Sequence, residues 1–132
     1  MNKLSGKIVS INNNEHISIV EVDVEGDIFR SIIIETPASV PFLKVGAQIK
    51  IMFKETEVII AKNFSGLISI QNKVRCKING IQKGKFLSKI ELNFKDRNIY
   101  SVITSDSVER LDLKLNEKVY ALIKTNEIMI AP

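Results

Sequence analysis

The sequence predicts an all-β protein built from two similar units, and three observations lead to that prediction. Apolar residues alternate with polar ones along several stretches, for example Val20–Val24 and Ile49–Phe53, which is the period of half-buried strands. Clusters rich in Asn, Asp and Gly separate those stretches, as expected of tight turns. The chain also repeats itself 70 positions later, so that residues 53–61 return as residues 123–131. Such a repeat indicates a duplicated folding unit.

The repeat divides the 132 residues into a first unit at 1–62 and a second unit at 67–132. A short hinge, Asn63–Gly66, joins them. Each unit is small and has only a thin apolar core of its own, so we expect the two units to pack against each other.

In the first unit, the strands come in a regular order with polar turns between them. Asn12–Asn14 and Glu25–Asp27 supply two turns. Pro37 is compatible with the first turn of a helix after the third strand, but Pro41 limits that helix to about one turn. The five strands are expected at Gly6–Ile11, Ile17–Val24, Ile28–Glu35, Ala47–Phe53 and Val58–Ala61.

The second unit repeats this order with a clearer helix signal. Asp106 is the expected N-cap, with Glu109 three residues later and apolar Val108 and Leu111 facing inward. The strands are expected at Lys77–Ile81, Phe86–Phe94, Arg97–Ile103, Lys118–Lys124 and Glu127–Ile130. Five strands with a helix between the third and fourth are typical of an OB-like small barrel. We therefore expect two tandem OB-like five-stranded barrels, each with one short helix.

Composition narrows the class of protein. An apolar fraction of 45% with 26% charged residues is that of an ordinary globular chain. No apolar run reaches the ~20 residues of a membrane helix, and polar Asn12–Glu15 interrupt the apolar stretch that a signal peptide would need. Cys76 is the only cysteine and has no disulfide partner. We therefore expect a cytoplasmic protein without membrane contact. The net charge of +4 gives weak support to an anionic partner.

The sequence offers no catalytic or metal-binding constellation. His16 is the only histidine, and no other metal ligands lie at a suitable spacing from it. A Gly-rich phosphate loop, a nucleophile elbow and a Cys–His dyad are all absent. We therefore expect a protein that is not an enzyme and that coordinates no metal ion directly.

Hydrogen-bond donors recur at three places in the second unit. Ser69–Asn72 precede the first strand, Thr104–Ser107 open the helix, and Lys124–Thr125 end the fourth strand. Neutral donors with one or two cations suit a fully deprotonated tetrahedral oxyanion, and they disfavour hydrogen phosphate, whose own proton would find no acceptor. The same residue types also cap helices and line turns, so spacing alone leaves both interpretations open.

At these positions the chain resembles the Mop family of molybdenum-binding proteins, also called molbindins and related to the TOBE domains of transport ATPases. Ser69–Asn72 resembles the family's Ser-Ala-Arg-Asn opening, Ser101–Leu111 its central stretch, and both Lys54–Ile60 and Lys124–Ile130 its closing stretch. The resemblance implies that molybdate or tungstate binds between small barrels that assemble as homo-oligomers, with a trimer favoured here. The residues it implies for the oxyanion site are Ser69, Gln71, Asn72, Thr104, Ser107, Lys124 and Thr125, together with Lys54 and Thr56.

Three departures from the family pattern affect the expected site. The family's arginine is Gln71 here, which removes a charge and a forked donor. The first-unit counterparts of the two helix hydroxyls are Ile34 and Pro37, which have no side-chain donor. Glu55 would repel a dianion. We expect the first unit to contribute less, and each site could combine residues from different units or chains.

Two other functions remain open. The departures at Gln71 and Glu55 are compatible with an assembly or regulatory module that has lost its ligand. An OB-type nucleic-acid module agrees with the fold and the pI of 9.2. Nucleic acid is the less favoured partner, however, because aromatic residues make up only 6% of the chain and do not cluster on one strand.

Overall fold

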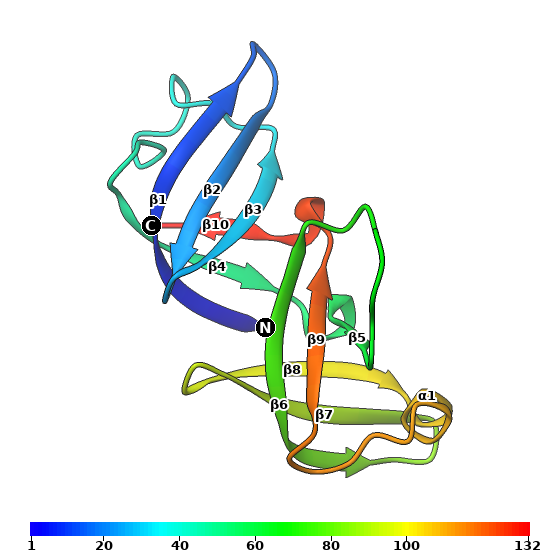
Figure 1. The fold of residues 1–132 in the computed structure, drawn as a ribbon. Coiled ribbons are helices and arrows are strands. Elements are labelled where there is room, and N and C mark those ends of the chain that lie inside the picture. Colours follow the sequence, from blue (N-terminus) through cyan, green and yellow to red (C-terminus); the bar gives the residue numbers. More distant parts are fainter.

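The computed structural model describes residues 1–132 as two curled, five-stranded antiparallel sheets with one short helix (Figure 1). The first half is the sheet with strand order β10-β4-β1-β2-β3, and the second half is the sheet with order β5-β9-β6-β7-β8. The first-repeat strands are β1 (Asn2–Asn13), β2 (Ser18–Val24), β3 (Asp27–Ile33), β4 (Gln48–Phe53) and β5 (Ile59–Ala61). The second-repeat strands are β6 (Asn72–Lys83), β7 (Leu87–Phe94), β8 (Arg97–Thr104), β9 (Lys118–Ile123) and β10 (Met129–Ala131). The predicted all-β fold of two five-stranded units is confirmed.

The two sheets exchange their last strands. After β4 the chain passes through a 3-10 turn, η1 (Glu55–Glu57), and β5 then pairs with β9 of the second half. After β9 it passes through η2 (Thr125–Glu127), and β10 pairs with β4 of the first half. The sequence repeats at 1–62 and 67–132 are therefore not identical with the two sheets, because each sheet takes its fifth strand from the other repeat.

Residue periodicity explains the two longest strands. In β1 and in β6, buried and exposed residues alternate over the first eight positions, and then the pattern slips at a bulge between Ile8 and Ser10 and between Ile78 and Gly80. A bulge bends a strand and increases its twist. One long strand can therefore pair with β4 or β9 along its first part and with β2 or β7 along its second part.

Helices differ from the expectation in both repeats. The helix α1 (Ser105–Arg110) starts two residues earlier than predicted, because Thr104 and not Asp106 is its N-cap, and Thr104 Oγ1 accepts a hydrogen bond from Ser107 N at 3.1 Å. Between β3 and β4 the first repeat forms only turns, for example at residues 37–39, and has no α-helix. Pro41 explains the difference, since a proline disfavours helical geometry in the residue before it.

A single apolar core runs through both halves. It contains 25 buried residues drawn from both repeats, and the rings of Phe29 and Phe94 meet edge to face at 5.9 Å between centroids. No helix of the structure has the length and apolar character needed to cross a membrane. The continuous core agrees with the expectation that neither unit is large enough to stand alone.

Four polar side chains join the two repeats. The Asn2 amide donates to Tyr100 O at 2.9 Å and accepts from Tyr100 N at 2.8 Å. The Asn72 amide makes the same pair of bonds with the main chain of Arg30, at 2.8 and 2.7 Å. The hydroxyls Ser31 Oγ and Ser101 Oγ donate to the carbonyls of Ile128 and Val58, respectively, at 2.6 and 2.7 Å.

Candidate oxyanion site

The strand exchange divides the predicted site residues between two corners of the molecule. At the first corner, η1 packs against β8, so Lys54 and Thr56 of the first repeat lie beside an edge strand built from the second. At the second corner, η2 packs against β3, so Lys124 and Thr125 of the second repeat lie beside an edge strand of the first. Each corner is therefore a composite of the two repeats.

The second corner collects donors from the ends of two paired strands. Asn72 of β6 is in register with Ile123 of β9, which places Gln71 next to Lys124. Both of those side chains are exposed, as is Ser69 two residues earlier. Lys124 forms no ion pair, so its charge is available to an anion.

Beyond the edge strand of this corner, the positions equivalent to Thr104 and Ser107 carry no side-chain donor. After β3 the chain continues through Ile34, which is 81% exposed, and Pro37. Beside this edge lies a groove of about 530 Å³ between the end of β3, the 40–43 segment and the η2–β10 segment. Glu35 and Asn126 are its only polar lining residues. The sequence of each repeat taken alone does not predict this groove, because β10 reaches it only through the exchange of end strands.

The first corner receives the helix hydroxyls. Thr104 ends β8, the strand against which η1 packs, and Ser107 lies one turn into α1. These two residues therefore share an edge with Lys54 and not with Lys124, and the expected grouping of all second-unit donors in one place is not what the fold provides. Figure 1 shows α1 and the turn after β9 at opposite ends of the second half.

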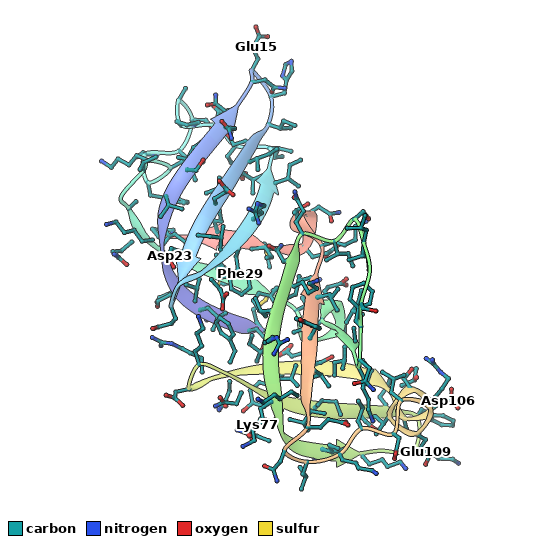
Figure 2. The ribbon with its side chains drawn as sticks, viewed as in Figure 1. Glu15, Asp23, Phe29, Lys77, Asp106 and Glu109 are labelled. Atoms are coloured by element: carbon teal, nitrogen blue, oxygen red, sulfur yellow. The ribbon has the colours of Figure 1, made fainter.

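Hydrogen bonding limits what the two hydroxyls offer. Thr104 Oγ1 donates to Ser107 Oγ at 2.8 Å while it accepts from Ser107 N. The Thr104 proton is therefore used within the helix cap, and the Ser107 hydroxyl retains a proton of its own to donate. Asp106 and Glu109 lie on the outer side of α1 (Figure 2).

Glu55 places a paired carboxylate at the first corner. A hydrogen bond from the amino group of Met1 lowers the pKa of the Glu55 carboxyl below its ordinary value. Glu55 is thus ionised at neutral pH, directly after Lys54 in the chain. The corresponding residue of the second corner is Thr125, whose hydroxyl can donate to an anion where the Glu55 carboxylate only accepts, so the second corner is the more favourable place for an anion.

Asn72 does not face either corner. Its side chain is fully buried, and both its oxygen and its nitrogen bond the main chain of Arg30. Asn72 resembles the asparagine of the family's opening motif, but in this structure its side chain joins the two halves. Asn2 repeats this task in the first repeat.

No cluster suitable for a metal ion forms in the structure. No three His, Cys, Asp or Glu side chains come together. Cys76 is buried, and burial raises the pKa of its thiol to about 12, so the thiol is protonated and inert. The candidate donors at the two corners are hydroxyls, amides and ammonium groups, which bind an anion by hydrogen bonds and charge.

The chain is similar in sequence to several known proteins. Residues 68–130 match the TOBE domain family. "Molybdenum-pterin-binding protein 1" of Clostridium pasteurianum is 36% identical over 64 residues, which cover 48% of this chain and 94% of that protein. "Molybdenum import ATP-binding protein ModC" of Brucella abortus is 27% identical over 112 residues, which cover 84% of this chain but only 29% of that protein.

Two solved structures resemble the fold. The cytoplasmic molybdate-binding protein ModG, solved with molybdate bound, superposes with a TM-score of 0.92 over 98% of this chain and 94% of its own, at 21% identity. A molybdate-binding protein from Sporomusa ovata covers 51% of this chain and 100% of its own, at 36% identity and a TM-score of 0.50. ModG shares the whole two-sheet architecture, and the Sporomusa protein corresponds to about half of it. Since one molybdenum-pterin-binding protein matches along nearly its whole length at 36% identity, the chain belongs to the Mop (molbindin) family, as a member with two tandem units.

Proposed function

We propose that this protein binds molybdate or tungstate and thereby stores, buffers or senses the oxyanion in the cytoplasm. The observation that carries the proposal is the pair of lysines, Lys54 and Lys124, each exposed, free of carboxylate partners and placed at the head of a turn beside the other repeat's edge strand. Relatives named for molybdenum and molybdate support the choice of ligand. The donor set points to binding and not to catalysis.

Ligand chemistry distinguishes molybdate from phosphate at such a corner. Molybdate is fully deprotonated at neutral pH, so every oxygen can accept from an ammonium, a hydroxyl or an amide. Hydrogen phosphate carries a proton that needs an acceptor, and the second corner offers mainly donors. Molybdate and tungstate have the same shape and charge, so this donor set should bind both.

We further propose that copies of the chain associate and complete the sites between them, most simply as a trimer. In a single chain both corners are open to solvent, and neither surrounds an anion. Ile34, with 81% of its surface exposed, and the apolar groove beside the second corner provide area for a neighbouring copy. Light scattering tests the assembly; a monomer in the presence and absence of molybdate contradicts it.

Calorimetric titration tests the ligand and the lysines together. Molybdate and tungstate should bind the unmodified protein, and sulfate should compete weakly. Lys124→Ala should weaken molybdate binding at least ~10-fold, because a charge-assisted hydrogen bond is lost at the corner without Glu55. Lys44→Ala, an exposed loop lysine, is the matched control and should bind normally. If molybdate gives no heat at high micromolar concentration with folded protein, the proposal fails.

A further inference from the structure

The outer face of β6 and β9 carries four cations beside two aromatic rings. The cations Lys73, Arg75 and Lys77 alternate along β6, and Lys118 lies on β9. Strand register pairs Arg75 with Tyr120 and Lys77 with Lys118. We call these four cations, with Tyr120 and Phe64, the basic face; Figure 2 labels Lys77 beside β6.

Aromatic rings contact two of the four cations of the basic face, Lys73 and Arg75, without neutralising them. Lys73 Nζ lies 5.3 Å from the Phe64 ring centre and 5.0 Å from that of Tyr120. Arg75 Cζ lies 5.5 Å from the Tyr120 centre, and Arg75 Nε donates to the Tyr120 hydroxyl at 3.3 Å. A ring attracts a cation but leaves its full charge available to an anion.

No carboxylate compensates this charge. None of the four cations forms an ion pair, although six other Lys or Arg side chains in the chain do. Lys77 and Lys118 are directly opposite each other in the ladder, and like charges at such positions destabilise a sheet. A bound polyanion would relieve this repulsion.

A hollow of about 200 Å³ opens within the basic face, between the hinge and β9. Its walls combine aromatic or apolar surface with polar groups and include no acid. The lining residues are Asn63, Phe64, Arg75, Lys118, Val119 and Tyr120. Such a hollow offers a planar ring two aromatic walls, an amide for hydrogen bonds, and cations at its rim for a phosphate.

The first repeat lacks this combination. At the positions of Arg75, Lys118 and Tyr120 it has Ser5, Gln48 and Lys50. Its equivalent face retains three lysines but no aromatic ring, no arginine and no pair of opposed cations. The basic face is thus a feature of one repeat, whereas an oxyanion corner exists at both ends of the exchange.

We propose that the basic face binds single-stranded nucleic acid. Alternate residues along β6 place Lys73, Arg75 and Lys77 about 6.7 Å apart, in a row that can follow the phosphates of an extended strand. One base enters the hollow beside Phe64 and Tyr120. A mononucleotide uses only part of this row. Sequence reasoning disfavoured nucleic acid because the aromatics are scattered along the chain, but folding brings Phe64 and Tyr120 to the same cation.

Fluorescence anisotropy with a labelled single-stranded oligonucleotide of about twelve nucleotides tests the proposal. Binding should weaken with salt, with a slope of log K against log salt of about −2 to −3, because three or four phosphates are contacted on a single strand. Adenosine monophosphate should compete at least ~10-fold more weakly than the unlabelled strand, since it meets only part of the row. Absence of binding at low salt overturns the proposal, and so does equal displacement by polyglutamate of the same charge.

Charge-matched variants separate the basic face from net charge. Arg75→Glu with Lys118→Glu should weaken oligonucleotide binding at least ~10-fold, whereas Lys7→Glu with Lys50→Glu on the first repeat should have a much smaller effect. Tyr120→Leu, which keeps the charge, should weaken binding several-fold. Equal loss in both charge variants would mean a general charge effect and would overturn the proposal. If the first variant unfolds, Tyr120→Leu decides alone. Molybdate titration of each variant is independent, so the two proposals can fail separately.

Discussion

Asparagine amides act as main-chain substitutes at the junction of the two halves. Asn72 presents an acceptor and a donor to the N–H and C=O of Arg30, as a neighbouring strand would. Asn2 does the same for Tyr100. An aspartate offers no donor and an alanine offers neither group, so asparagine is the small residue that satisfies both partners.

Replacing Asn72 should therefore destabilise the whole protein. Asn72→Ala leaves the part-buried N–H and C=O of Arg30 without their side-chain partners, and the expected loss is about 1–3 kcal/mol of unfolding free energy. Urea denaturation measures it, with Asn79→Ala, at an exposed position on the same strand, as control. A loss no greater than that of the control would mean that the two bonds contribute little to the junction.

Gln71 is the position where an added charge should strengthen oxyanion binding. Its side chain is exposed and lies next to Lys124 at the second corner. Gln71→Arg restores the family's forked donor, and molybdate affinity should rise ~3–10-fold in calorimetry. Gln82→Arg adds the same charge at an exposed position near the other end of β6 and should change affinity little. Unchanged affinity in Gln71→Arg would favour a module that has lost its ligand.

Residue types indicated the donors but not their neighbours. Lys124 and Thr104 both belong to the second repeat, and the sequence places them in one predicted site. In the folded protein Lys124 lies beside β3, whereas Thr104 lies at the end of β8. Asn72 has the right type for a ligand, and only its burial and its bonds to Arg30 reveal its structural task.

At the scale of elements, two hairpin turns meet with opposite charge. The β2–β3 turn carries Glu25 and Asp27, and the β7–β8 turn carries Lys95 and Arg97 at the corresponding positions of the repeat. Lys95 Nζ lies 3.0 Å from Asp27 Oδ2 and donates to Glu25 O at 2.7 Å, while Arg97 pairs with Glu25. Divergence between the repeats has thus made one turn acidic and given the other, which also contains Asp96, a net positive charge, and this favours pairing of unlike repeats.

Charge reversal tests this pairing. Glu25→Lys with Asp27→Lys places four positive charges together and should lower the unfolding free energy by about 1 kcal/mol, a modest value because all four side chains are partly exposed. Adding Lys95→Glu and Arg97→Glu exchanges the signs and should recover most of the loss. Both effects should shrink in high salt. Additive losses in the fourfold variant would show that the turns do not interact.

The elements themselves were largely predictable, and their partners were not. Period-two patterns located all ten strands, because alternation reports one buried face, although β1 and β6 begin at Asn2 and Asn72, before the expected Gly6 and Lys77. Alternation does not say which neighbour a strand pairs with, and repeats with similar sequences offer β5 and β10 two chemically similar partners. The short turns η1 and η2, which carry the chain across to the other half, decide the outcome.

For the whole molecule, the exchange makes two repeats one folding unit. A core of 25 residues crosses the junction, and each half needs three residues of β5 or β10 from the other repeat to complete its sheet. Disruption of β5 or β10 should therefore reduce protection from hydrogen exchange in the strand that it pairs with, and not in the strand that precedes it in sequence.

Ile130→Pro tests this expectation in the intact chain. Proline removes a main-chain donor from β10, which pairs with β4 at Ile51, so hydrogen exchange should accelerate in β4 while β9 keeps most of its protection. Ile60→Pro in β5 is the matched variant and should have the mirror effect, because Ile60 pairs with Ala121 of β9. If each proline instead exposes the strand that precedes it in its own repeat, β9 for Ile130 and β4 for Ile60, then the sheets do not exchange strands in solution. Loss of protection in the strand of the other repeat requires that each repeat supplies the last strand of the other's sheet. In such a chain, the corners with Lys54 and Lys124 form only when both repeats are folded.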